Sequence, residues 1–187
     1  MAKETEPDAF NVEALERSLN DSATRVSTIW ISFLIFGLYL LAAAASVTHR
    51  QLFFDAPIKL PVLNIDLPLS GFFFLAPILF VIFHVYVLIQ VLLLARTAAT
   101  YNEALDRAVK VRAEKAAMRQ RLANTLFAQI FAGSPRDRND WLRVLLQLMA
   151  AITLVVAPIY ILVIFQSKFL PYHNSGVTIR RLRAPNR

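Results

Sequence analysis

The chain has 187 residues, of which 57 % are hydrophobic and 18 % are charged, and its formal net charge is +7. A soluble domain is about 45–50 % apolar, so this excess of apolar residues points to a membrane protein. Cysteine is absent, which excludes disulfides, thiolate metal sites and a cysteine nucleophile.

The basic excess, with a sequence pI of about 10.1, indicates an anionic partner. Nucleic-acid binding usually appears as a basic face on a soluble domain. No such domain remains once the apolar segments are set aside, so we expect no nucleic-acid partner. The lipid bilayer, and its anionic lipid head groups in particular, fits the composition better.

Three runs of the chain carry no Asp, Glu, Lys or Arg, and they are 23, 29 and 24 residues long (26–48, 67–95 and 144–167). About 20 helical residues cross a hydrocarbon core of about 30 Å. Each run is apolar all round, which favours lipid over a soluble core. The sequence predicts an all-α integral membrane protein with transmembrane helices at 26–48, 71–95 and 142–166.

The distribution of Lys and Arg sets the predicted orientation. Residues 1–25 carry three, the first loop two, the stretch 96–143 ten and the tail five. Because positive residues accumulate on the inner side, we expect 1–25 and 96–141 in the cytoplasm. The loop 49–70 and the basic tail 167–187 then lie outside an inner (plasma) membrane.

The outer loop contains Pro57, Pro61 and Pro68, which exclude a regular helix. Residues 58–60 and 63–67 alternate apolar and polar side chains. This alternation predicts a short β-hairpin or an extended lid on the outer face, and an ordinary extended connector is the alternative.

No Pro or Gly occurs over residues 78–132, and strong helix formers dominate after Arg96. The second transmembrane helix is therefore expected to continue as a long cytoplasmic helical extension, folding back near 119–122 as a hairpin. One apolar face is predicted along it, formed by Leu105, Val109, Ala113, Ala116, Met118, Leu122, Leu126 and Ile130.

A basic face is predicted on the same region, formed by Arg107, Lys110, Arg112, Lys115, Arg119 and Arg121. It has three interpretations. It can bind anionic head groups, it can contact a second copy of the chain or another protein through the helices, or it can be a solvated stalk that obeys the positive-inside rule.

His84, Tyr86 and Gln90 form a candidate polar site inside the second apolar run. An ionisable group in hydrocarbon is a functional candidate, but a neutral histidine bonded to a neighbouring helix is the favoured interpretation over proton relay or metal binding. No Asp or Glu accompanies it within a span, so we predict no metal, cofactor or catalytic residue and no enzyme.

Smaller signals concern helix ends and packing. Ala42 and Ser46 form a small-xxx-small pair that suggests close packing. Pro77 and Pro158 each remove a backbone hydrogen bond within a span. Asp21 is a candidate cap for the first helix.

Residues 60–88, LPVLNIDLPLSGFFFLAPILFVIFHVYVL, resemble the N-terminal membrane region of bacterial pentapeptide-repeat membrane proteins, and so does FLPYH at 169–173. The resemblance covers about residues 18–173 and implies kinship and a bacterial inner membrane, without an activity. Such proteins continue with a further apolar segment and a β-helix of repeats. Here 14 residues follow His173; a shortened product, a fragment and a stand-alone relative are the open explanations.

Two functional hypotheses follow from the sequence. The first is a non-enzymatic membrane anchor or scaffold whose cytoplasmic helical region meets lipid or a partner. The alternative is a small transporter or channel subunit, which needs self-association because three helices cannot enclose a pathway alone.

Overall fold

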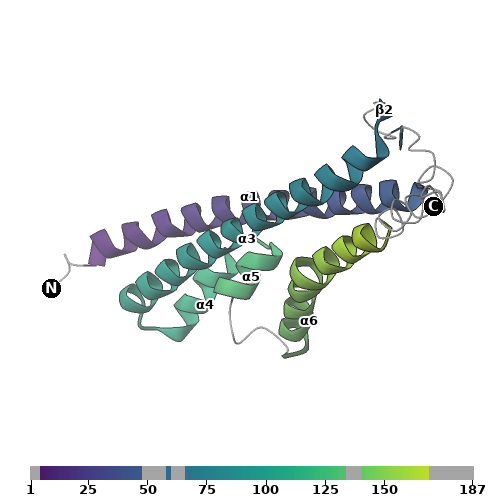
Figure 1. Ribbon diagram of the computed structural model, residues 1–187. Helices are drawn as coiled ribbons and strands as arrows, with labels where there is room; N and C mark the ends of the chain where they lie inside the picture. The colour runs from purple at the N-terminus through teal and green to yellow at the C-terminus, as the bar shows by residue number, and fades with distance from the viewer. Residues whose placement is uncertain (1–4, 48–57, 60–65, 134–139, 169–187) are drawn as a thin grey trace, which may run out of the picture. The chain divides into compact units, whose positions relative to one another are not determined.

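The computed structural model describes residues 5–47, 58–59, 66–133 and 140–168 (Figure 1). The chain divides into two compact units. Unit 1 comprises Met1–Phe33 and Val85–Leu154, and unit 2 comprises Leu34–His84 and Val155–Arg187. The described residues are almost entirely helical.

The first helix, α1, runs over Thr5–Ser46 and so begins well before residue 26. Asp21 lies inside it and does not cap it. The longer helix has a packing reason, because its buried residues follow one another mostly at steps of three and four, the spacing of a helix seam. The stripe begins within residues 1–25 and consists of Val12, Leu19, Ala23, Val26, Trp30, Phe33, Gly37, Leu40 and Ala44; Ala43 is buried beside it, and Val47 continues it directly after the helix.

The second long helix, α3, spans Leu69–Ala108 and contains Pro77. Its buried stripe has the same spacing and consists of Phe73, Ala76, Phe80, Val87, Leu94, Ala98, Tyr101 and Leu105. The helix thus continues past Ala95, as expected. It ends at Ala108, however, earlier than the predicted fold-back near 119–122.

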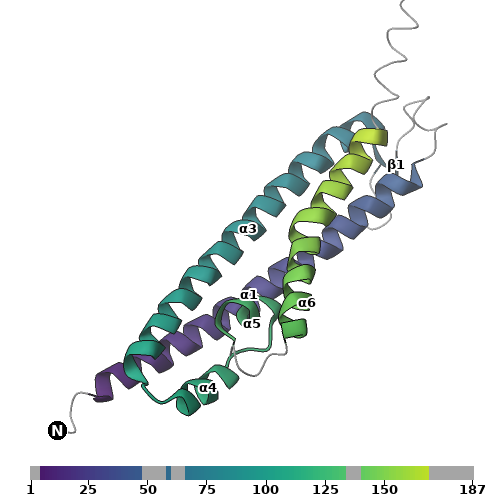
Figure 2. The same ribbon diagram turned by 90° about the horizontal axis from the view of Figure 1, so that it is seen from below.

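Two short helices follow in unit 1, α4 (Arg112–Gln120) and α5 (Leu126–Ala132). The break before α4 contains no Gly or Pro; the β-branched Val109 and Val111 have weaker helix propensity than their neighbours. Figure 2 shows α4 turning back from the end of α3 and α5 beside α1.

The predicted apolar face of this region is only partly correct. Leu105 and Leu122 are buried, but α4 has no buried residue, and α5 buries Phe127, Ala128 and Ala132. Leu126 and Ile130 are only half-buried. The prediction assumed one continuous helical face. The chain instead turns between α4 and α5, and α5 buries a different side from the one predicted.

The third long helix is interrupted. It begins as α6 (Asp140–Ala151), passes through a π-helical turn η1 (Ile152–Val156), and continues as α-helix over residues 157–168. Pro158 follows the π-helical turn directly, and both prolines and π-helical turns are established causes of local distortion in a helix.

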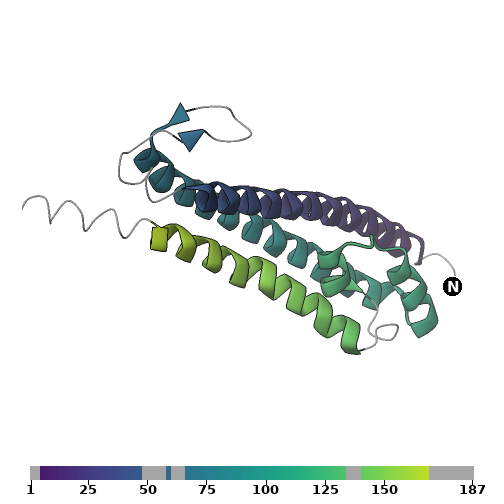
Figure 3. The same ribbon diagram turned by 90° about the vertical axis from the view of Figure 1, so that its right-hand side faces the viewer.

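A short antiparallel pairing connects β1 (Ile58–Lys59) to β2 (Asp66–Leu67), with Ile58 opposite Leu67 and Lys59 opposite Asp66 (Figure 3). These residues belong to the two alternating segments of the predicted hairpin. Residues 60–65 lie outside the described part of the chain, and the side of the membrane on which this pairing lies stays a prediction.

Unit 2 is packed through aromatic rings and one glycine. Phe165 lies 5.7 Å from both Phe72 and Phe73, measured between ring centroids. At Gly37 the helices come close, because a Cβ atom there would lie 3.0 Å from Ile161 Cδ1 and 3.3 Å from Phe80 Cε2. Ala42 and Ser46, the predicted close-packing pair, are instead exposed.

Among the described residues, three helical segments are long and apolar enough to cross a membrane, Val12–Ser46, Gly71–Ala108 and Trp141–Lys168. Their outward faces carry large apolar side chains, for example Phe74 at 70 % exposure and Ile82 at 60 %. Such faces are unsuited to water and fit hydrocarbon. The chain therefore has the helices of a multi-pass membrane protein.

Candidate interaction site on the basic helices

The candidate intramembrane residues do not share one face of α3. His84 is half-buried and falls in the register of the buried stripe, four residues after Phe80 and three before Val87. Tyr86 is 46 % exposed, and Gln90 is half-buried. Tyr86 and Gln90 lie two and six residues after His84, so on a helix of 3.6 residues per turn they point to other sides than His84 does.

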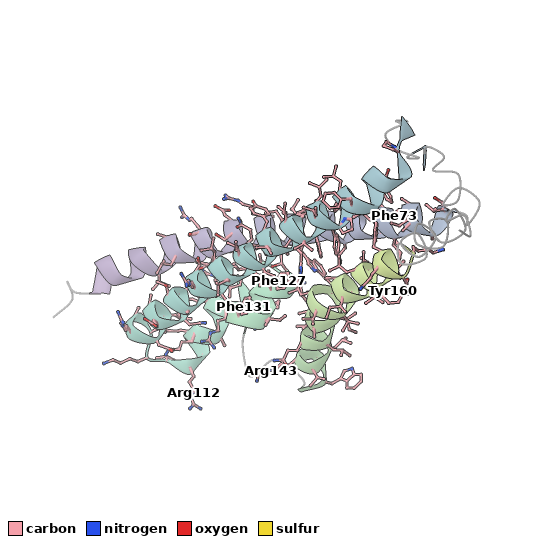
Figure 4. The ribbon with its side chains drawn as sticks, viewed as in Figure 1. Phe73, Arg112, Phe127, Phe131, Arg143 and Tyr160 are labelled. Atoms are coloured by element: carbon pink, nitrogen blue, oxygen red, sulfur yellow. The ribbon has the colours of Figure 1, made fainter. Side chains whose placement is uncertain are left out.

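The predicted basic face divides into two groups in the structure. Four of its residues are exposed: Arg107, Lys110, Arg112 and Arg121. Figure 4 shows the side chain of Arg112 projecting away from α4. Arg107 also lies 3.5 Å from Glu103 one turn earlier, in an ion pair between exposed side chains, which is worth little.

Lys115 and Arg119 form the second group, because both are half-buried and bind within unit 1. Lys115 Nζ donates to Asp106 Oδ1 at 2.6 Å. Arg119 Nη2 donates to Asn102 Oδ1 at 3.4 Å. Both contacts hold α4 against the last turns of α3, so Lys115 and Arg119 stabilise the fold. The other four basic residues remain exposed and can contact a partner.

Two asparagines hold the turns around α5. Asn20, on α1, accepts a hydrogen bond from the backbone N–H of Ala123 through Oδ1 at 2.6 Å. Asn102, on α3, donates from Nδ2 to the carbonyl oxygen of Phe131 at 3.2 Å. The loop before α5 and the end of α5 are therefore tied to two different long helices.

An aromatic contact lies between these two ties. The rings of Trp30 and Phe127 meet edge to face with centroids 5.6 Å apart, and Phe131 stacks on Phe127 at 6.5 Å. Both phenylalanines project from α5 (Figure 4). The indole Nε1 of Trp30 donates to Thr153 Oγ1 at 3.2 Å, which joins α1 to the π-helical turn.

Next to this network lie polar atoms that the fold buries without a hydrogen bond. Among the described residues of unit 1 they are Tyr101 Oη, Arg119 Nε and Thr125 Oγ1. Tyr101 is fully buried. A buried polar atom without a partner costs stability, so the hydroxyl of Tyr101 does not contribute a stabilising bond here.

Sequence reasoning missed the contacts of Asn20 and Asn102 and the hydrogen bond between Trp30 and Thr153. A signal was present for the two asparagines, because Asn is a poor residue for a helix interior and each lies within a long helical segment. Phe127 had no such signal, since a phenylalanine in an apolar segment fits either face.

The described residues contain no group of three or more His, Asp or Glu side chains able to hold a metal ion. No family model matches the chain, and the comparisons with curated proteins and with solved structures found no match.

Proposed function

We propose that the protein is a non-enzymatic membrane anchor or scaffold whose four exposed basic residues bind anionic lipid head groups. These residues, Arg107, Lys110, Arg112 and Arg121, are called the basic surface below. The proposed location is a bacterial inner membrane with the N-terminus in the cytoplasm. The location follows the resemblance of residues 60–88, and the orientation follows the bias of Lys and Arg.

The observation that carries the proposal is the way in which α4 is held in place. This helix has no buried residue, so packing alone does not explain it. Two of its cations attach it to α3, through Asp106 and Asn102, while Arg112 remains exposed. Intramolecular bonds thus hold α4 in place, with one exposed cation on the helix (Arg112) and two beside its ends (Lys110 and Arg121).

The position of the basic surface along the chain favours lipid as its partner. Arg25, Arg96 and Arg143 border the three charge-free runs at the ends that belong to unit 1, and all three are exposed. The first residue of the basic surface, Arg107, follows Arg96 by eleven positions, or about 16 Å of helix. Near an anionic membrane surface each Lys or Arg contributes about 1 kcal/mol.

The test is a fluorophore on α4 in nanodiscs of defined lipid. Glu114 is exposed, and Glu114→Cys gives a unique thiol because the chain has no cysteine. We expect quenching by neutral acrylamide to fall when phosphatidylglycerol is added to phosphatidylcholine. High salt should restore it, since the Debye length shrinks to about 3 Å at 1 M.

Two charge reversals sharpen the test. Lys110→Glu with Arg112→Glu should remove the effect of phosphatidylglycerol, whereas Arg17→Glu, an exposed charge on α1, should leave it in place. Equal quenching in both lipids for the unmodified basic surface would refute head-group binding. An acidic protein surface would then be the partner to seek.

A further inference from the structure

The short helix α5 has the composition of a membrane segment although it lies in the region expected to be cytoplasmic. No charged residue occurs between Arg121 and Arg136, and α5 itself reads LFAQIFA. Composition alone does not distinguish a helix in lipid from one in a small soluble core. The depth of its contacts along the long helices does.

The ring of Phe127 reaches a level inside the apolar part of the bundle. It contacts Trp30, which follows Arg25 by five residues, about 7.5 Å along α1. A second helix gives an independent depth, because Trp30 bonds to Thr153, ten residues or about 15 Å beyond Arg143. Both distances place the Phe127 ring on the hydrocarbon side of the bordering arginines.

The two ends of the segment lie on the opposite side of those arginines. Ala123 is bound by Asn20, five residues or about 7.5 Å before Arg25. The carbonyl of Phe131 is bound by Asn102, six residues or about 9 Å beyond Arg96. The segment therefore starts in the head-group region, turns the Phe127 ring inward and returns.

We propose that α5 is an interfacial helix that binds phospholipid at the boundary between head groups and acyl chains, on the side of the basic surface. Interfacial helices bury their apolar face about 5–10 Å into this boundary, and the depth of about 7.5 Å along α1 falls in that range. Phe127 itself packs inside the bundle, so other residues of α5 form the side that faces lipid. Leu126, Gln129, Ile130 and Phe131 are half-buried, so each retains surface for lipid.

This inference does not rest on charge-driven binding of head groups. An embedded α5 holds α4 near the membrane in any lipid, because only residues 121–125 connect them. The basic surface would then bind anionic lipids near α4, but it would not be needed to bring α4 to the membrane.

Nitroxide labels on single cysteines test the depth of α5. The labels are placed on Gln129→Cys or Ile130→Cys, with two references: Glu114→Cys on α4 and Ile159→Cys in the third span, where the native side chain is 57 % exposed. In vesicles of pure phosphatidylcholine, relaxation by oxygen and by a water-soluble nickel complex is compared.

We expect the α5 labels to give a ratio of oxygen to nickel accessibility several-fold above that at position 114 and below that at 159. Labels on α5 that match position 114 would overturn the proposal. Pure phosphatidylcholine removes the lipid charge, so failure of head-group binding and failure of this inference are read separately.

A second variant covers the case in which a label disturbs α5. Phe131→Trp is made in a Trp141→Phe background that keeps Trp30 and its contact with Phe127, and the signal of Trp141→Phe alone is subtracted to isolate the tryptophan at position 131. Phospholipids brominated close to the head group should quench its fluorescence. Lack of quenching, with acrylamide quenching as strong as for a free tryptophan, would also overturn the proposal.

Discussion

Replacing Gly37 tests the packing of unit 2 directly, because this residue marks the close approach of α1 to Phe80 and Ile161. A Cβ atom would lie 3.0 Å from Ile161 Cδ1 and 3.3 Å from Phe80 Cε2. The first contact is to the end of a flexible side chain, which can shift by a few tenths of an ångström. Small residues permit such approaches between transmembrane helices.

The size of the substitution decides the expected result. Gly37→Ala adds one methyl group, and the gain in helix propensity of up to about 1 kcal/mol offsets the displacement of Ile161, so its stability should stay near wild type. Gly37→Leu adds three further carbons toward atoms already in contact. Overpacking of this kind costs about 1–3 kcal/mol.

The measurement is the free energy of unfolding in mixed micelles with increasing dodecyl sulfate, followed by circular dichroism. Ala42→Leu is the matched control, because Ala42 lies on α1 five residues later and is exposed; it should change stability by less than about 0.5 kcal/mol. If Gly37→Leu and Ala42→Leu are equally stable, the assignment of the packed face of α1 is wrong.

Three further substitutions address unit 1 and the span. Asn20→Ala should lower stability by about 1 kcal/mol because the N–H of Ala123 loses its acceptor, while Thr24→Ala, at an exposed site, should not; chemical unfolding measures both. Tyr101→Phe removes a buried hydroxyl without a partner, so its thermal midpoint should be unchanged or higher, and a large decrease would show a missed bond. His84→Ala should reduce stability only, and a solute flux in proteoliposomes that vanishes with it would favour the transporter alternative.

The three apolar helices were predictable because charge-free length is a strong signal and needs no tertiary information. Their ends were less so. The polar residues before Val26 were interpreted as a separate segment, yet α1 includes them. The stripe through Val12 and Leu19 shows why: a helix continues when a seam continues, whether lipid or water surrounds its other faces.

For the basic residues of the candidate site, the sequence predicted which residues to consider but not which of them are exposed and which are bonded within the fold. All six basic residues were identified from sequence, but composition cannot tell Lys115, bonded to Asp106, from Arg112, which is exposed. That difference depends on where α3 ends, and no Gly or Pro marks the end at Ala108. Propensity differences of a few tenths of a kcal/mol are too small to locate such a turn.

The third helix illustrates why periodicity fails inside a span. Its more buried residues include Leu146 and Ala150 before the π-helical turn, Thr153 and Leu154 within it, and Ala157, Pro158, Ile161 and Phe165 after it. Thr153 and Leu154 are adjacent, as are Ala157 and Pro158, so no single position in each turn marks the packed side near the π-helical turn. In a soluble helix a polar face would identify the packed side. Here residues 144–167 carry no Asp, Glu, Lys or Arg, and only a few positions, among them Gln147, Thr153, Pro158 and Gln166, differ from their apolar surroundings. In an apolar span, the residues that break the uniformity therefore carry the information on which side of the helix packs.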